Sequence, residues 1–146
     1  MNKTNAGREA GVRVSTDPAE LDLDWIVAAL SERAYWAEGR PRDVIERSLA
    51  NSLCFGAFDG DGRQIGFARV VTDEATFGWV CDVFVDESAR GRGIGKRLVE
   101  AIVADPRVDG LRLFLATRDA DELYRRYGGF ETVRNPERLM ERPRRA

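Results

Sequence analysis

The chain has 146 residues, with 23 basic and 25 acidic side chains and no histidine, so its formal net charge is −2. This length fits one domain, and a composition that is 43% hydrophobic and 33% charged supports a buried core with a well-solvated surface. The near-neutral balance gives no general field for binding nucleic acid. Without histidine, Ser-His-Asp and Cys-His nucleophilic catalysis are excluded, and the sequence predicts no metal site.

Both ends of the sequence are predicted to lie outside the domain. Residues 1–11 form a polar leader without the apolar core of a signal peptide, and residues 141–146 form a basic tail, which leaves 12–140 as the domain. No apolar run approaches the roughly 20 residues needed to cross a bilayer. We therefore expect a cytoplasmic protein that binds neither membranes nor nucleic acid.

The first half of the domain is predicted to hold a short strand over 12–15 and then two helices. Four apolar residues recur at helical spacing after Asp22 and predict a helix that runs toward Gly39: Leu23, Ile26, Val27 and Leu30. A second helix follows Pro41, whose missing N–H is harmless in the first turn of a helix.

From residue 53 the hydrophobic period changes to that of strands. Segments 53–58 and 64–71 flank a turn at Asp59-Gly60-Asp61-Gly62, which predicts a hairpin, and 76–85 adds a third antiparallel strand. A long helix begins near Ile94 and ends before Asp105-Pro106. The remaining elements are predicted as a strand over 111–116, a helix over 120–127 and a last strand near 130–133.

These elements predict a single α/β domain with a mixed central sheet. The strands before the long helix form an antiparallel meander, while the strands on either side of it form a parallel pair joined by a right-handed crossover. The two cysteines, Cys54 and Cys81, each lie in a predicted apolar strand. Buried structural thiols are therefore favoured over metal ligands or nucleophiles.

The most informative segment is the turn from the strand that ends Val83-Phe84-Val85 into the long helix. It carries the run Arg90-Gly91-Arg92-Gly93-Ile94-Gly95-Lys96. Backbone amides at a helix start lack internal partners and, with the helix dipole, favour a diphosphate. Glycines permit close approach and the basic side chains add charge. The spacing matches neither a P-loop nor G-x-G-x-x-G, and a flexible, solvated connection is the alternative interpretation.

Arg90, Gly93 and Gly95 match the pattern R-x-x-G-x-G directly after an apolar strand, and here the sequence resembles the GNAT superfamily of acetyl-CoA-dependent N-acetyltransferases. A second segment is similar to that family's L-Y-x-x-x-G-F: Leu123-Tyr124-Arg125-Arg126-Tyr127-Gly128-Gly129-Phe130. The resemblance extends from the first strand to Phe130. This chain has one additional glycine before the phenylalanine, which a longer helix C-cap could absorb.

The resemblance implies that acetyl-CoA is the cosubstrate, that the turn wraps its pyrophosphate and that the preceding strand bonds its pantetheine arm. The implied cofactor residues are Val83, Phe84, Val85, Arg90, Gly91, Arg92, Gly93, Ile94, Gly95, Lys96, Asp119 and Tyr124. Relatives often carry a cofactor-bonding Asn in the region of Asp119, but we favour a role for Asp119 as the N-cap of the next helix. The resemblance also implies a bulge near Val83 that turns a backbone N–H toward the thioester.

By the same resemblance, Tyr124 is the general acid that protonates the leaving thiolate, since a phenol with a pKa near ~10 stays protonated at neutral pH. Packing of its helix against the sheet is the alternative role. The general base stays open. Asp82, an isolated acid in an apolar strand, is our candidate, Asp73 and Glu74 are rivals, and water could accept the proton by relay.

Acceptor contacts in this fold usually come from the two early helices. Tyr35 and Trp36, with Arg40 and Arg42 nearby, could form an aromatic wall for a small anionic or aromatic amine; the alternative places both aromatics in the core. We therefore favour a small-molecule N-acetyltransferase that works by direct attack. A catalytically silent acyl-CoA-binding module and a protein lysine or N-terminal acetyltransferase are the alternatives, and a homodimer stays open.

Overall fold

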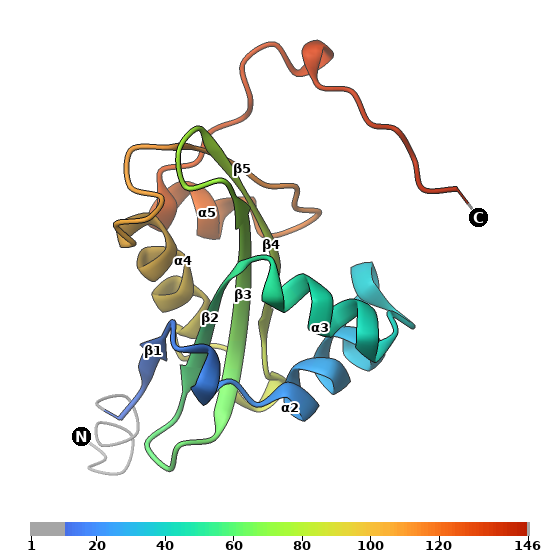
Figure 1. Ribbon diagram of the computed structural model, residues 1–146. Coiled ribbons are helices and arrows are strands. Elements are labelled where there is room, and N and C mark those ends of the chain that lie inside the picture. The colour runs from blue at the N-terminus through green and yellow to red at the C-terminus, as the bar shows by residue number, and fades with distance from the viewer. Residues whose placement is uncertain (1–10, 146) are drawn as a thin grey trace.

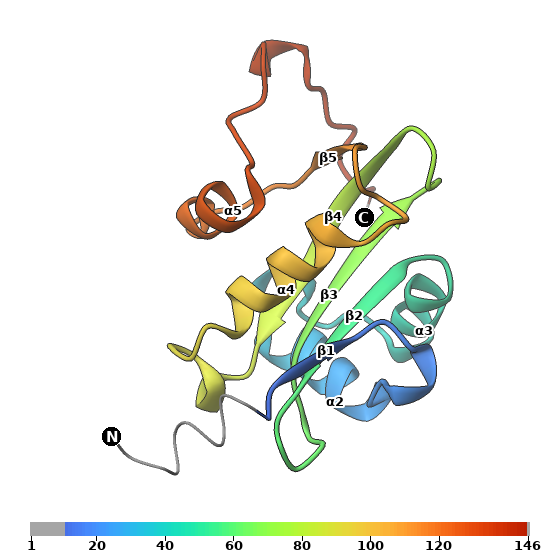
Figure 2. The same cartoon turned by 90° about the vertical axis from the view of Figure 1, so that its left-hand side faces the viewer.

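The computed structural model describes residues 11–145, in which a five-stranded sheet is covered by helices on both faces (Figures 1 and 2). The strands lie side by side in chain order: β1 (Arg13–Ser15), β2 (Leu53–Phe58), β3 (Gln64–Thr72), β4 (Phe77–Val85) and β5 (Arg112–Phe114). Neighbours from β1 to β4 are antiparallel, and β4 and β5 are parallel. The predicted mixed α/β sheet is therefore confirmed.

Two layers of helix enclose two separate cores. Helix α4 (Ile94–Ala104) packs on one face of the sheet with α5 (Asp121–Gly128) beside it, and α2 (Leu23–Ala28) and α3 (Arg42–Ala50) cover the other face (Figure 2). The α4 face buries Phe55, Ala57, Val70, Leu98 and Ile102 among others. The second core is built around Ile26, Leu30, Ile45, Phe67 and Phe84. The sheet is thus buried on both sides.

Helix α2 begins as the sequence predicts, because the Asp22 carboxylate accepts a hydrogen bond from the Trp25 amide at 3.0 Å. It does not continue to Gly39. The chain widens into a π turn (Ala29–Arg33), straightens at Ala34 and re-forms only a 3₁₀ turn (Tyr35–Ala37). This break leaves Tyr35 and Trp36 51% and 41% exposed, so their placement in the core is excluded.

The hairpin and the long helix form where the sequence predicts them. In the β2–β3 turn the Asp59 carboxylate accepts from the amides of Asp61 and Arg63, and Gly62 takes the left-handed φ of 82°. Helix α4 ends at Ala104, directly before Asp105-Pro106. None of the described helices is long and apolar enough to cross a membrane. The predicted leader lies outside the described residues, except for Gly11.

The predicted last strand near 130–133 is wrong. Gly129 ends α5 in the left-handed conformation and the Phe130 amide bonds back to the Tyr124 carbonyl at 3.2 Å, so a longer C-cap absorbs the extra glycine. The Phe130 ring then packs edge-on against Tyr124. Residues 130–133 form no ladder, and beyond Asn135, with its φ of 52°, the chain leads away from the body (Figure 1). Strand β5 therefore remains the edge of the sheet.

Candidate acetyl-transfer site

The site begins where β4 and β5 part. Their last paired residues are Trp79 and Phe114, whose rings stack with centroids 6.0 Å apart. Beyond this point β4 continues alone to Val85, while the chain that follows β5 leads to α5. No described strand therefore pairs with β4 beyond Trp79 on the side that faces β5. The backbone N–H and C=O groups of this half of β4 are available on that side.

A cavity of about 290 Å³ lies at the start of α4, lined by the glycine-rich turn and by α5: Val85, Ala89, Arg90, Gly91, Gly93, Ile94, Gly95, Lys96, Leu123 and Tyr127. Gly91 and Gly93 adopt φ of 78° and 76°, and a Cβ atom added at either would meet no other part of the chain within 4 Å. Gly93 caps α4 without any side-chain hydrogen bond. The first amides of α4 are thus uncapped by side chains and open to a ligand, with cationic side chains at the rim.

Seven of the predicted cofactor residues line this cavity, and the side chains of the other five do not. The Phe84 ring is buried in the α2-side core under the Arg33 guanidinium, so only its backbone can face a ligand. Arg92 does not line the cavity. The cap predicted for Asp119 is wrong, because Ala120 is the N-cap of α5 and its amide bonds to Thr117 Oγ1. The Asp119 side chain is 72% exposed.

A bulge interrupts β4 next to the turn. The register with β3 shifts between Phe67 and Arg69, so Asp82 and Val83 together oppose the single residue Ala68. Asp82 has a left-handed φ of 54°, which aspartate tolerates better than most residues. The Val83 side chain packs on the α4 face, whereas the Asp82 carboxylate turns to the α2 face. A bulge therefore lies where the family resemblance places one.

The Asp82 carboxylate is 1% exposed and accepts three hydrogen bonds, each 2.9 Å long. The donors are Trp36 Nε1, the Arg40 guanidinium and Arg69 Nε. Arg69 also donates to Ser52 Oγ. Sequence analysis missed Arg69. This residue is an isolated charge in β3, the strand that pairs with the strand of the isolated Asp82. Arg42, by contrast, pairs with Asp24 and Glu46 at the surface.

Tyr124 lies on α5 and is only 9% exposed. Burial, with a smaller contribution from the charge of Tyr35, raises the pKa of Tyr124 to about 12. Tyr35 in turn lies under the Arg118 guanidinium at 3.8 Å and meets the Trp36 ring edge-on at 5.0 Å. The predicted acceptor residues Tyr35 and Trp36 therefore contact each other, and Trp36 links them to Asp82. The predicted acid, Tyr124, lies within electrostatic reach of Tyr35.

The rival bases lie away from this cluster, and the two cysteines are neutral thiols. Asp73 and Glu74 lie in the β3–β4 turn, at the opposite end of β4 from the bulge. Hydrogen bonds from Thr76 and Ala75 hold the pKa of Asp73 well below its usual range. Burial raises the pKa of both cysteine thiols to about 11, which leaves Cys54 and Cys81 as neutral, weakly nucleophilic groups.

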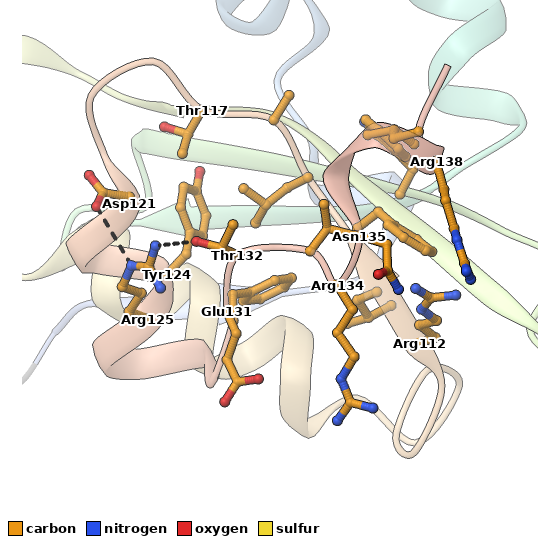
Figure 3. Close-up of a pocket in the computed structure, with 18 residues that line it drawn as sticks. Arg112, Thr117, Asp121, Tyr124, Arg125, Glu131, Thr132, Arg134, Asn135 and Arg138 are labelled. Carbon is orange, nitrogen blue, oxygen red and sulfur yellow. Dashed lines mark hydrogen bonds and ion pairs between the residues drawn. The ribbon is translucent and has the colours of Figure 1, made fainter. Parts of the chain in front are cut away.

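A second cavity, of about 1000 Å³, extends from Tyr124 along the outer side of β5 (Figure 3). Asp121, Tyr124 and Arg125 lie at one end of it, and Arg112, Arg134 and Arg138 lie at the other (Figure 3). Its remaining walls are mainly the apolar residues Leu113, Phe114, Leu115, Phe130, Val133 and Leu139. Sequence analysis did not anticipate this cavity, because it predicted a strand in that place.

Comparison with known proteins agrees with this geometry. A family profile described as "Acetyltransferase (GNAT) domain" matches residues 50–131. A Gibberella zeae protein named as an acetyltransferase is 33% identical over 143 residues, covering 83% of this chain and 80% of its own. A chloroplastic serotonin N-acetyltransferase 2 of Oryza sativa is 36% identical over 74 residues, covering 51% of this chain and 37% of its own.

The solved structures point the same way. A structure from Xanthomonas campestris, described as a GNAT-family acetyltransferase, superposes with a TM-score of 0.86 at 48% identity, over 90% of this chain and 92% of its own. A Staphylococcus aureus protein described as a probable acetyltransferase gives a TM-score of 0.72 at 25% identity, over 92% and 99%. The chain belongs to the GNAT acetyltransferase family.

Proposed function

We propose that this protein transfers the acetyl group of acetyl-CoA to the amine of a small molecule by direct attack, in the cytoplasm. The observation that carries the proposal is the position of α5 between two features of the site. Its residues Leu123 and Tyr127 close the amide-lined cavity, and its Tyr124 presents a buried phenol beside the acceptor cluster. One short helix thus joins a diphosphate site to a proton donor.

The residues of the turn fit coenzyme A. The open faces of Gly91 and Gly93 leave room for a pyrophosphate against the first amides of α4, and Arg90 and Lys96 supply positive charge. The unpaired edge of β4 up to Val85 offers backbone donors and acceptors to an extended amide-containing arm. Bound in this way, acetyl-CoA supplies an activated thioester, and the Val83 amide at the bulge is our candidate for holding the carbonyl oxygen.

Tyr124 Oη is our proposed donor of the proton that the leaving sulfur needs. With a pKa of about 12, the phenol stays protonated throughout the working pH range, as a general acid must before each turnover. No covalent intermediate on the protein is needed. The raised pKa of both thiols supports attack by the amine itself over a route through a cysteine.

Asp82 is better suited to positioning than to proton uptake. Its two oxygens already accept from an indole and two guanidinium groups, and a proton on the carboxylate would weaken all three bonds. We therefore propose that water takes the proton of the amine, while Asp82 fixes Trp36 and the bulge. Tyr35, Trp36 and Arg118 then line the acceptor side, and the name of the rice relative makes aromatic amines the first acceptors to test.

The test is a screen of small amines and lysine peptides with acetyl-CoA, read by release of free thiol, followed by Tyr124→Phe with the best acceptor. We expect an amine to be acetylated and the single-turnover rate to fall by roughly 100-fold in Tyr124→Phe, because only the proton donor is lost. Thermal stability and coenzyme A affinity serve as controls and should persist. Coenzyme A binding without turnover of any amine would instead identify a silent binding module, and turnover of peptides alone would identify a protein acetyltransferase.

A further inference from the structure

Arg118 joins two separate parts of the acceptor side. It lies in the loop that connects β5 to α5, next to Thr117, whose Oγ1 accepts a hydrogen bond from the Ala120 amide at 3.0 Å. Thr117 lines the same cavity as Tyr124 (Figure 3). From this loop the Arg118 guanidinium reaches the 3₁₀ turn after α2, where its Cζ lies 3.8 Å from the centre of the Tyr35 ring. One cationic side chain thus connects the loop before the proposed proton donor with the aromatic pair.

The contact with Tyr35 holds the Arg118 guanidinium and leaves its donors free. A guanidinium carbon over the face of a ring uses the flat surface of the group and none of its N–H donors. Among residues 11–145 the carboxylate that pairs with Arg118 is that of Asp119, at 4.0 Å, and the two side chains are 66% and 72% exposed. Such an exposed pair at this distance contributes little. The N–H groups of Arg118 are therefore oriented and open to a ligand.

The charges next to Trp36 also favour an anionic group on the ligand. Trp36 donates to the buried Asp82 carboxylate, which accepts from Arg40 and Arg69 as well. This cluster has one more positive charge than negative charge, and Arg118 adds a second cation whose only paired carboxylate in the described chain is exposed and 4.0 Å away. A guanidinium group matches a carboxylate with two parallel N–H···O bonds. The acceptor side is therefore suited to a carboxylate.

We propose that Arg118 binds a carboxylate of the acceptor, so that the substrate is an amino acid with an aromatic side chain and not a simple amine. The inference rests on the proposed acetyl transfer for the place of the amine. The rings of Tyr35 and Trp36, 51% and 41% exposed, give an apolar surface to the aromatic side chain. The amine nitrogen bonds to the acetyl carbon, the thioester C–S bond breaks, the sulfur takes the proton of Tyr124 and water takes that of the amine. The carboxylate is held throughout and is not changed.

The first test is binding without turnover, measured by calorimetry in the presence of coenzyme A. The probes are 3-phenylpropionate, which has a ring and a carboxylate but no amine, and its uncharged amide. We expect Arg118→Gln to weaken binding of the carboxylate by about 10-fold or more and to leave binding of the amide unchanged. Arg13→Gln is the matched control, because Arg13 also lies over a ring, that of Phe58, and pairs with Glu20 at the surface. Equal affinity of the carboxylate for the wild type and Arg118→Gln, or no binding to either, would overturn the proposal.

The second test compares turnover of phenylalanine and 2-phenylethylamine, which differ only in the carboxylate. The ratio of their kcat/KM values should fall by about 10-fold or more in Arg118→Gln, and by less in Arg118→Lys, which keeps the charge but not the planar fork. Because the ratio is compared between variants, the different basicity of the two amines cancels. An unaltered ratio in Arg118→Gln would contradict the proposal. Binding of the carboxylate probe through Arg118 without acetylation of any amine would refute the proposed function alone, so the two failures are distinguishable.

Discussion

The two halves of the site are built from different material. The cofactor half is mostly backbone: a turn of consecutive residues from Arg90 to Lys96 offers amides and open glycine faces. The acceptor half is made of side chains from four separate segments, joined through Asp82, Trp36 and Arg69 on one side and through Tyr35 and Arg118 on the other. A site made of local backbone therefore restricts the residue types at a few consecutive positions only. A site made of side chains from distant segments depends on the whole fold.

The largest effect is expected from a charge placed on the backbone half. Gly93→Asp adds a carboxylate where the amides of α4 are open, so like charge and lost access should weaken coenzyme A binding by at least about 100-fold. Titration calorimetry measures the change. Gly62→Asp is the matched control, because Gly62 has a similar φ of 82° and the same open surroundings in the β2–β3 turn. Equal coenzyme A affinity in the two variants would contradict the assignment of the diphosphate site to this turn.

The side-chain half is tested by Asp82→Asn. Asparagine tolerates the left-handed backbone, but it leaves two half-buried guanidinium groups without their carboxylate, so the free energy of unfolding should fall by about 2–3 kcal/mol. Asp24→Asn, which breaks an ion pair whose carboxylate is 85% exposed, should cost less than about 1 kcal/mol. Urea denaturation of the two variants measures both changes in the free energy of unfolding.

The same variant separates two roles of Asp82 in catalysis. A positioning role predicts a lower kcat with the shape of the pH–rate profile retained. Loss of the acidic limb of that profile in Asp82→Asn would mean that the carboxylate is the general base after all.

The smallest expected effect is the response of the buried Cys54 thiol to alkaline pH. Burial raises the pKa of Cys54 from 9.0 to about 11, so the folded state resists ionisation that the unfolded chain undergoes. The contribution of the neutral Cys54 thiol to the free energy of unfolding is therefore fully present below pH 9. It is lost between about pH 9 and 11 and amounts to about 1–2 kcal/mol. Cys54→Ala should reduce the stability difference between pH 8 and pH 10.5 and leave turnover unchanged. An undiminished difference would show that another group, such as Tyr124, governs alkaline unfolding.

The same contrast between local backbone and distant side chains explains which parts of the site could be predicted from the sequence. The glycine-rich turn and the helix that carries Tyr124 follow from short patterns, since glycine spacing and strand-to-helix order depend on neighbours in the chain. The bulge was expected from the family resemblance alone. The bonds of Asp82 could not be predicted in the same way, because Trp36 and Arg40 reach it from 46 and 42 residues away. Only Arg69 left a local signal, as a lone charge in the strand that pairs with the strand of Asp82. The last strand failed because the Gly129 C-cap directs Phe130 back onto Tyr124, so residues 130–133 form no ladder with β5.

The pairing of one carboxylate with two guanidinium groups also has a consequence for the amine. Asp82, Arg40 and Arg69 together carry one surplus positive charge, next to the indole of Trp36. An ammonium ion that enters this neighbourhood meets a like charge, whereas its neutral form does not, so the surplus shifts the protonation equilibrium of a bound amine toward the form that can attack. At the acceptor side that we propose, this static charge would do part of the work of a general base.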